Sequence, residues 1–169
     1  MIEMKYVPED SEILLTECKD FDFTNPPHDP KELAQALHDT MVKSDGLGLS
    51  ANQVGIPYKV FVMRTGDTPF AMFNPRVVDM SDKEISMKEG CLSFPLLYLS
   101  VQRPDAVRVR FQNEHGETNT ERFIGMTARI VLHEFDHMLG KVYTQKASQY
   151  ETQRALRKRM ILKRKVKKI

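Results

Sequence analysis

Two histidines four residues apart, with a glutamate directly after the first, are the part of this sequence best suited to chemistry. They stand in "VLHEFDHMLG" as His133, Glu134 and His137. Residues four apart share one face of a helix, so both imidazoles can reach a single metal ion. A catalytic site of the zinc type takes three protein ligands and leaves one position open for water. The chain therefore needs a third ligand from elsewhere.

The third ligand is not supplied by the residues that follow. Zinc proteases with such a helix take it from downstream, but residues 138–169 contain no His, Cys or Asp and a single Glu, Glu151. The upstream candidates are Cys91, His28, His38 and His115. We expect His38 to be solvated, because it stands beside Asp39 in a predicted helix. Cys91, in "KEGCLSFP", fits a small buried thiol as well as it fits a ligand.

A glycine-rich segment, "GLGLSANQVGIP" at 46–57, is the third chemically distinctive stretch. It is not a phosphate cradle, because no Lys-Ser/Thr pair follows it and no strand is predicted before it. It fits a flexible turn after a helix. Alternatively, Gly46 and Gly48 allow an extended backbone to lie close to a partner peptide, and Gln53 offers an amide donor.

Taken together, "GLGLSANQ", "EGCLS" and "HEFDH" resemble, in this order, the motifs of the peptide deformylases. The resemblance runs from about residue 29 to about residue 150. One departure is Ser50, where the family pattern has alanine; we expect it to affect only hydrogen bonding in the loop. The resemblance implies that Cys91 joins His133 and His137 in binding one divalent ion. It further implies ferrous iron in the cell, with nickel or zinc as substitutes.

The resemblance also implies the reaction. Members of this family remove the formyl group from N-formylmethionine at the start of nascent polypeptides and release formate. Glu134 would act as general base toward water and then as acid toward the leaving amine. The side-chain amide of Gln53 and the backbone N–H of Leu92 match the family's oxyanion donors.

Substrate contacts follow from the same segments. We expect the peptide to lie extended against Gly46 and Gly48 and to pair through its backbone. Leu47, Met126 and Ile130 fit either a pocket for the methionine side chain or ordinary core packing. Glu89 and Gly90 precede Cys91 and are further candidates for substrate binding. Glu89 and Asp136 can also orient the ligands, with Arg103 as a partner of Glu89, or form ordinary salt bridges.

The elements that position these residues are predicted from local patterns. Asp29-Pro30 begins a helix that ends near Asp45-Gly46. Strands are predicted over 58–64 and 69–74 around the turn Gly66-Asp67, and a hairpin over 106–123. Helices are predicted over 127–139, stopped by Gly140, and over about 148–165. The fold class is α+β, with short, mostly antiparallel strands around a central metal-binding helix.

Chain length and charge limit the number of domains and the kinds of partner that we expect. The chain of 169 residues fits one catalytic domain, 1–169, that ends in a basic helical tail over about 148–169. Residues 154–169 hold nine Lys/Arg and no acid, which leaves 16 Lys/Arg against 23 Asp/Glu before them. This tail fits a solvated helix packing Leu156, Met160 and Leu162 on the body, or a surface that binds the ribosome, as in some deformylases.

The sequence shows no secretory signal, no membrane span and no disulfide pattern. We therefore expect a monomer in the cytoplasm of a bacterium or phage-infected host, or in an organelle stroma or matrix. Two other functions fit parts of the chain. A general zinc endopeptidase would need the missing downstream ligand. A metal-stabilised RNA- or ribosome-binding module would need four protein ligands, and the sequence offers three.

Overall fold

The first helix begins and ends close to the residues that predict it. The computed structural model describes residues 4–167. Helix α1 (Pro30–Lys43) starts after Asp29, whose carboxylate accepts a hydrogen bond from the backbone N–H of Glu32. Proline in the first turn has no N–H to leave unpaired. Local capping chemistry therefore fixes where this helix begins.

One face of α1 is buried, and His38 lies on it. Leu37 and Met41 on this face are fully buried, and His38 is only 4% exposed. The expectation of a solvated His38 is wrong, because its spacing from Ala34 and Met41 keeps it on the buried face. Within the described residues, neither ring nitrogen of His38 has a hydrogen-bond partner.

Five strands form one antiparallel sheet in the order β1-β2-β3-β6-β7. Their bounds are β1 (Gly48–Ser50), β2 (Val60–Met63), β3 (Phe70–Met80), β6 (Ala106–Gln112) and β7 (Thr118–Ile124). The predicted turn between β2 and β3 and the predicted β6–β7 hairpin are both confirmed. Strand β1, at one edge of the sheet, lies in a segment for which no strand is predicted.

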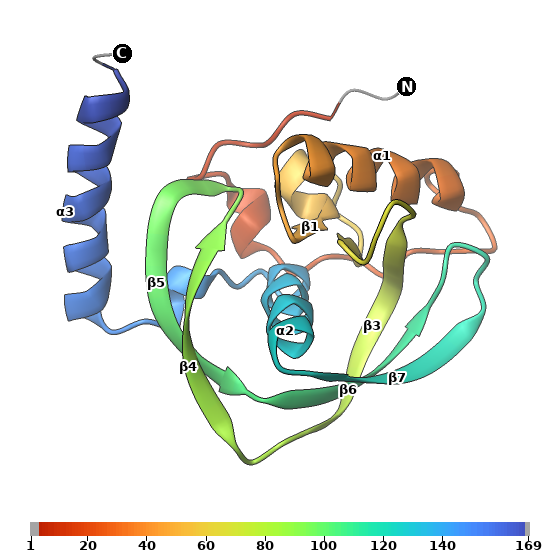
Figure 1. Cartoon of the computed structure of the whole chain (residues 1–169). Coiled ribbons are helices and arrows are strands. Elements are labelled where there is room, and N and C mark those ends of the chain that lie inside the picture. The colour runs from red at the N-terminus through yellow and green to blue at the C-terminus, as the bar shows by residue number, and fades with distance from the viewer. Residues whose placement is uncertain (1–3, 168–169) are drawn as a thin grey trace.

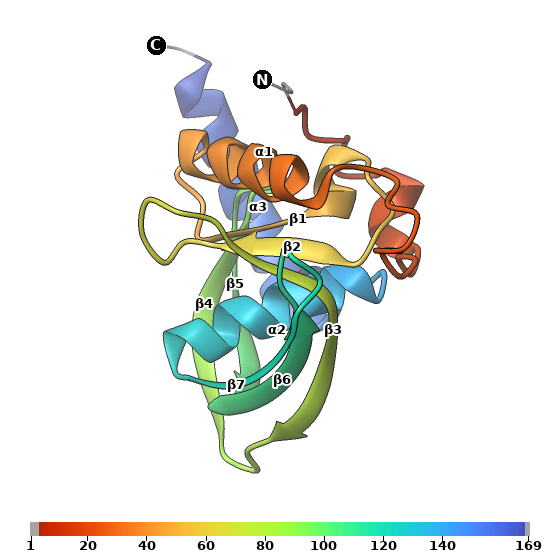
Figure 2. The ribbon, with the colours of Figure 1, turned by 90° about the vertical axis from the view of Figure 1, so that its right-hand side faces the viewer.

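Strand β2 is buried on both faces, which explains its uninterrupted apolar sequence. Val60 and Val62 pack with the buried face of α1, whereas Phe61 and Met63 belong to the cluster that includes residues of the metal-binding helix. Side chains along a strand alternate between its two faces. The first strands therefore lie between two helices, as Figure 2 shows with α1 above them and α2 (Met126–Met138) below.

A second sheet pairs β4 (Glu84–Cys91) with β5 (Phe94–Pro104), and the sequence pattern predicts neither strand. Lysine, glutamate and glycine in β4, and proline in β5, are poor strand formers. The pairing of β4 with β5 is irregular between Glu89 and Cys91, just before the tight turn that leads to Phe94. This sheet brings Cys91 to the central helix.

Helix α2 (Met126–Met138) runs between the two sheets and contacts strands of both (Figure 1). The predicted stop at Gly140 is confirmed, with the backbone at φ 68°. A Cβ on Gly140 would lie 2.6 Å from the carbonyl carbon of Thr16. Both the positive φ and this close contact therefore require glycine at this position. The N-terminal segment therefore packs tightly against the end of α2.

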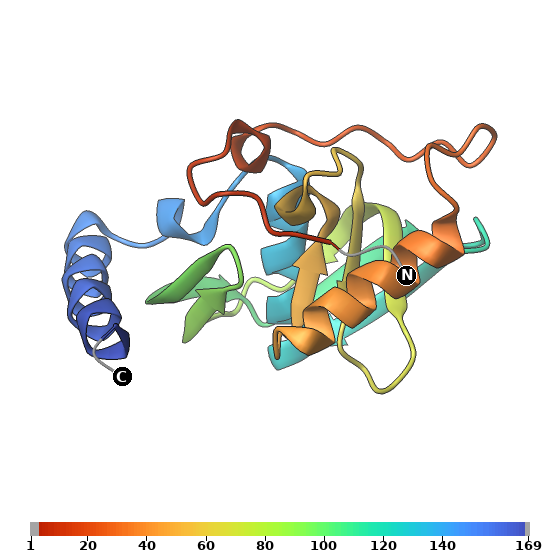
Figure 3. The ribbon, with the colours of Figure 1, turned by 90° about the horizontal axis from the view of Figure 1, so that it is seen from above.

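The C-terminal helix, α3 (Gln149–Val166), stands beside β5 and away from the rest of the body (Figures 1 and 3). Ser148 caps it by accepting a hydrogen bond from the N–H of Glu151. No described residue of α3 is buried. Leu156 and Met160 are 39% and 53% exposed, so the expectation that these two pack on the body is wrong, whereas Leu162 is partly buried.

Ala155 packs instead against the cluster of β5 residues and Tyr143. Arg159 extends this contact with an ion pair to Glu9, in which Nη1 lies 2.8 Å from the carboxylate. The cationic face of α3 thus remains in solvent. Within residues 4–167, the structure contains no helix with the length and apolar character needed to cross a bilayer.

Candidate functional site

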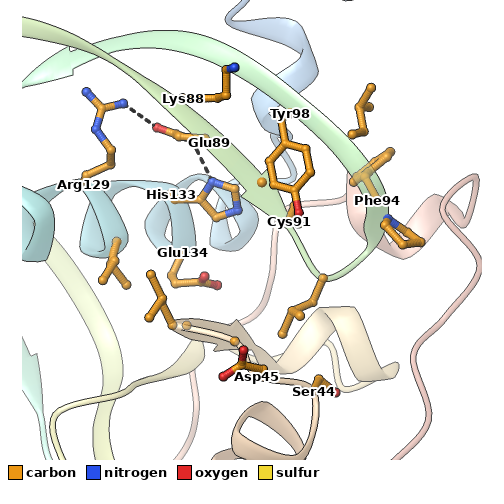
Figure 4. A pocket seen from close by; sticks show the side chains of 18 of the residues that line it. Ser44, Asp45, Lys88, Glu89, Cys91, Phe94, Tyr98, Arg129, His133 and Glu134 are labelled. Carbon is orange, nitrogen blue, oxygen red and sulfur yellow. Dashed lines mark hydrogen bonds and ion pairs between the residues drawn. The ribbon is translucent and has the colours of Figure 1, made fainter. Parts of the chain in front are cut away.

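Helix α2 and the end of β4 bring together three side chains that can bind a metal ion. His133 and His137 lie one turn apart on α2, with ring centroids 5.1 Å apart. The sulfur of Cys91 lies 3.4 Å from Nε2 of His137. One ligand atom from each of the three residues lies within 4.8 Å of the others. Figure 4 shows Cys91 and His133 side by side on the wall of a pocket.

These three residues fit a divalent transition metal. A tetrahedral ion with bonds of about 2.0–2.3 Å holds its ligand atoms roughly 3.5 Å apart, close to the observed sulfur–nitrogen distance. Thiolate and imidazole ligands suit iron, nickel and zinc. His28 and His115 are exposed and lie outside the cluster, and His38 is buried in α1. Of the candidates, Cys91 is the third member of the cluster.

A buried charge network lies behind His133. The carboxylate of Glu89 is 2.9 Å from Nδ1 of His133 and 2.7 Å from Nη1 of Arg129, and it also forms an ion pair with Arg103. Arg103 contacts Asp136 at 2.8 Å. The expected Glu89–Arg103 pair is therefore present, and Asp136 belongs to the same network.

The network keeps Glu89 ionised. Burial alone would raise the pKa of Glu89, but hydrogen bonds from His133 and Arg103 outweigh it and hold the pKa at about 2. An anionic Glu89 accepts a hydrogen bond from Nδ1 of His133, which leaves Nε2 for the cluster. The carboxylate of Glu89 thus orients the ring of His133, and a direct contact of Glu89 with substrate remains a prediction.

The two histidines have opposite electrostatic environments. Burial lowers the pKa of His133, but hydrogen bonds to Cys91 and Glu89 outweigh it and raise the pKa to about 10. A metal ion that binds Nε2 of His133 must therefore displace a proton. His137 is buried beside His133 and Arg103, and its pKa falls well below the ordinary value. His137 is therefore a neutral imidazole, the form that binds metals.

Glu134 lies beside the cluster, between α2 and β1. It is 4% exposed, and burial raises its pKa against the opposing effects of His133 and Ser50. A Cβ on Gly48 would lie 2.5 Å from Oε1 of Glu134, so only glycine lets β1 approach this carboxylate. Gly48 thus lies close to the side chain of Glu134, and its approach to a partner peptide remains a prediction.

A pocket of about 530 Å³ opens in front of these residues, bordered by β1, α2 and the β4–β5 turn. All the residues predicted for the site except His137 line this pocket. The predicted residues that line it are Gly46, Leu47, Gly48, Gln53, Glu89, Gly90, Cys91, Leu92, Met126, Ile130, His133 and Glu134. Leu47 and Met126 are 52% and 49% exposed, which favours pocket walls over core packing. Ile130 both lines the pocket and packs against the core.

The two predicted oxyanion donors are both at the pocket. Nε2 of Gln53 lies 2.9 Å from Oγ of Ser93 and 3.5 Å from the sulfur of Cys91. Its Oε1 accepts a hydrogen bond from the N–H of Ser50 at 2.9 Å, which fixes the orientation of the amide. Leu92 follows Cys91 at the turn into β5. Their role toward an oxyanion remains a prediction.

Several residues of the site are not indicated by sequence patterns. Arg129 donates to Glu89 and to the backbone carbonyls of Val101 and Ile85, and so ties α2 to both strands of the second sheet. Its spacing of four residues from His133 on a helix is the one signal that could have indicated it. Phe94 and Tyr98 from β5 line the pocket (Figure 4), and nothing in the sequence places them there.

Comparisons with known proteins agree with this geometry. The family model described as Polypeptide deformylase matches residues 3–153. Peptide deformylase 1 of Bacillus anthracis is 35% identical over 158 residues, which cover 89% of this chain and 96% of that protein. The crystal structure of peptide deformylase from Thermotoga maritima has 31% identity and a TM-score of 0.82, with 88% of this chain and 99% of that chain covered.

A third similar protein was solved as a complex. It is a peptide deformylase from Synechococcus elongatus in complex with actinonin, with 27% identity and a TM-score of 0.86. The match covers 92% of this chain and 86% of that chain. The likeness to solved structures therefore extends over nearly the whole chain.

Proposed function

This chain belongs to the polypeptide deformylase family, and from that premise we propose how its own residues carry out the reaction and which metal and partners it uses. It is a hydrolase that removes the N-formyl group from nascent polypeptides. The observation that carries the proposed mechanism is the cluster of Cys91, His133 and His137 beside the buried carboxylate of Glu134, at the wall of one pocket.

Three residues would bind the ion, and Glu134 accepts and then donates the proton. Cys91, His133 and His137 would hold a divalent ion, which would supply Lewis acidity and make water a nucleophile at neutral pH. Glu134 accepts the proton of the attacking water and delivers it to the leaving amine as formate departs. The amide of Gln53 and the N–H of Leu92 donate to the formyl oxygen as negative charge develops on it.

The substrate lies as an extended strand across the pocket. Strand β1 is an edge strand of its sheet, so one side of its backbone has no strand partner among residues 4–167. A peptide beside β1 can pair through its backbone, which tolerates many sequences after the first residue. Leu47, Met126 and Ile130 surround the methionine side chain with apolar surface.

Release of formate from a short formyl-Met peptide tests this function. We expect activity on the formylated peptide, none on casein, and loss of activity when a chelator removes the metal. Casein digestion at a rate comparable to deformylation would favour the general zinc endopeptidase instead. An unformylated peptide of the same sequence is the matched control for the substrate.

For the metal, we propose ferrous iron in the cell, with nickel or zinc able to substitute. The donor set accepts all three, and the family resemblance supports iron. We expect air to inactivate the iron form faster than the nickel form, because iron and the Cys91 thiolate both oxidise. Activity and metal content are followed in parallel after anaerobic loading. Equal sensitivity of the two forms would count against iron oxidation as the cause.

The proposed setting is the compartment where formylated chains are made. This is the cytoplasm of a bacterium or phage-infected host, or the stroma or matrix of an organelle. Both cysteines are free, which fits a reducing compartment. The cluster and the pocket are built from one chain, which supports a monomer.

For the partner, we propose that α3 binds the ribosome through its cations. The support is a helix with no buried residue and a cationic face left in solvent. A chain that ends at Gln153 should keep its activity on a short peptide, because the pocket and the cluster lie before α3. It should lose ribosome binding that falls with salt, since each cation–phosphate contact releases counterions. Sedimentation with ribosomes at two salt concentrations measures this.

A full-length variant separates the charge of α3 from its presence. Changing Lys158, Arg164 and Lys165 to Gln keeps the helix and leaves the Arg159–Glu9 pair intact. We expect the dependence of log affinity on log salt to become shallower, by roughly 0.7–0.9 for each phosphate that is no longer neutralised. If truncated, substituted and original chains sediment equally with ribosomes, α3 is only a solvated helix.

A further inference from the structure

Ser50 stands where the peptide deformylase pattern has alanine, and its hydroxyl contacts Glu134. Oγ of Ser50 lies 2.8 Å from Oε2 of Glu134 and 3.2 Å from the backbone oxygen of the same residue. Ser50 is fully buried at the end of β1. The contact joins residues 84 positions apart in the chain, across the junction of β1 and α2.

The hydroxyl can donate to only one of these two oxygens at a time. A serine carries one O–H donor, and both contacted atoms of Glu134 are acceptors when the carboxylate is ionised. The carboxylate contact is the shorter one, and hydrogen bonds to charged acceptors are the stronger kind. The O–H of Ser50 therefore donates to Oε2 of Glu134.

Ser50 itself is held in place from two sides. Its N–H donates to Oε1 of Gln53 at 2.9 Å, and it pairs with Phe61 of β2 in the sheet ladder. The hydroxyl is therefore presented from a fixed backbone. Gly48, two residues earlier on the same side of β1, packs against the other carboxylate oxygen, Oε1.

The two carboxylate oxygens of Glu134 therefore have different contacts. Oε2 receives the hydrogen bond from Ser50, whereas no side chain within residues 4–167 donates a hydrogen bond to Oε1. Figure 4 shows Glu134 projecting from α2 below His133 into the pocket. A single rotamer with one free oxygen is the arrangement that a proton acceptor needs.

We propose that Ser50 is a positioning residue, whose hydroxyl fixes the carboxylate of Glu134 with Oε2 occupied and Oε1 free to accept a proton. This rests on the proposed role of Glu134. With alanine at this position, only packing would hold the carboxylate. The hydroxyl is thus a feature of this chain's own active site, added to the family pattern.

The test is the kinetics of Ser50→Ala on a formyl-Met peptide with the metal-loaded enzyme. We expect kcat to fall about 10- to 100-fold, the range for losing a hydrogen bond to a charged group. KM and metal content should change little, because alanine fits the same space. Ser50→Thr keeps a hydroxyl on the same carbon and should restore much of kcat. Unchanged kcat in Ser50→Ala overturns the proposal.

Two further variants separate positioning from a purely structural effect. In a Glu134→Gln background, Ser50→Ala should have little further effect on single-turnover rates, since the carboxylate it positions is gone. Equal losses in both backgrounds would show that Ser50 does not act through Glu134. Thr40→Ala removes another hydroxyl, one that donates to the backbone carbonyl of Ala36 at 2.7 Å within α1. We expect kcat of this control to be unchanged.

The Glu134→Gln and Ser50→Ala variants together separate the role of Glu134 from that of Ser50. If Glu134→Gln turns over at nearly the original rate, the role of Glu134 as base is wrong, whatever Ser50→Ala does. If Glu134→Gln is inactive and Ser50→Ala is fully active, the role of Glu134 stands and the positioning role of Ser50 is wrong.

Discussion

Glu134→Gln should keep its metal and lose about 10²–10⁴-fold in kcat, the usual contribution of a general base. The amide of glutamine has nearly the shape of the carboxylate but cannot accept the proton of water. None of the clustered atoms of Cys91, His133 and His137 is altered. Formate release from a formyl-Met peptide, with metal content measured on the same sample, checks this result.

The matched control is Glu121→Gln, the same chemical change on an exposed residue of β7. It should leave kcat unchanged. A Glu134→Gln protein with near-normal turnover and a full equivalent of metal would show that another group accepts the proton.

Cys91→Ser is expected to weaken metal binding by more than about 100-fold, beyond the 10–100-fold typical of residues that only orient ligands. A serine hydroxyl has a high pKa and is a poor donor to a soft ion, whereas a thiolate binds iron, nickel and zinc well. The sulfur of Cys91 lies 3.4 Å from Nε2 of His137, so the remaining ligands cannot replace it without movement. Competition with a chromogenic chelator measures the affinity.

The second cysteine of the chain provides the control. Cys18 is buried, with its sulfur 3.9 Å from the backbone oxygen of His137, and burial raises its pKa to about 11. Cys18→Ala should therefore leave metal affinity nearly unchanged, and His133→Ala should weaken it as Cys91→Ser does. If Cys91→Ser binds a full equivalent with unchanged affinity, the three-ligand assignment is wrong.

The elements predictable from the sequence are those specified by nearby residues. Helix α1 is capped by Asp29 within its first turn, and α2 ends at a glycine with positive φ. The β6–β7 hairpin combines an alternating strand with a turn that contains Gly116. In each case the signal lies within a few residues of the element, so sequence patterns are sufficient.

Strands β4 and β5 cannot be predicted from local patterns, because contacts with residues distant in the sequence stabilise them. Glu89, an unfavourable strand residue by itself, is compensated by Arg103 from the neighbouring strand β5 and by Arg129 from α2. No local pattern shows that a charge will be buried and paired in this way. The prediction for His38 is wrong for a related reason, since the polarity of the residue conceals its place on the buried face of α1.

Prediction of the site depends on the order of three motifs more than on any one of them. The helix spacing of His133 and His137 is enough to predict their shared face. Cys91 cannot be separated from a buried thiol until "EGCLS" is combined with the other two segments. For Ser50, the sequence predicts an effect on the loop alone, because nothing in it indicates that β1 packs against Glu134.

The charge network behind His133 bears on how this protein unfolds. Arg103 and Arg129 already tie the second sheet to α2 through Glu89, before any ion is bound. An ion shared by Cys91 and His137 would cross-link the same two elements and close a loop of 46 residues. By analogy with a disulfide, such a closure restricts the unfolded chain by about 4 kcal/mol. The resistance of this enzyme to heat should therefore depend on metal concentration, even where its folded shape does not.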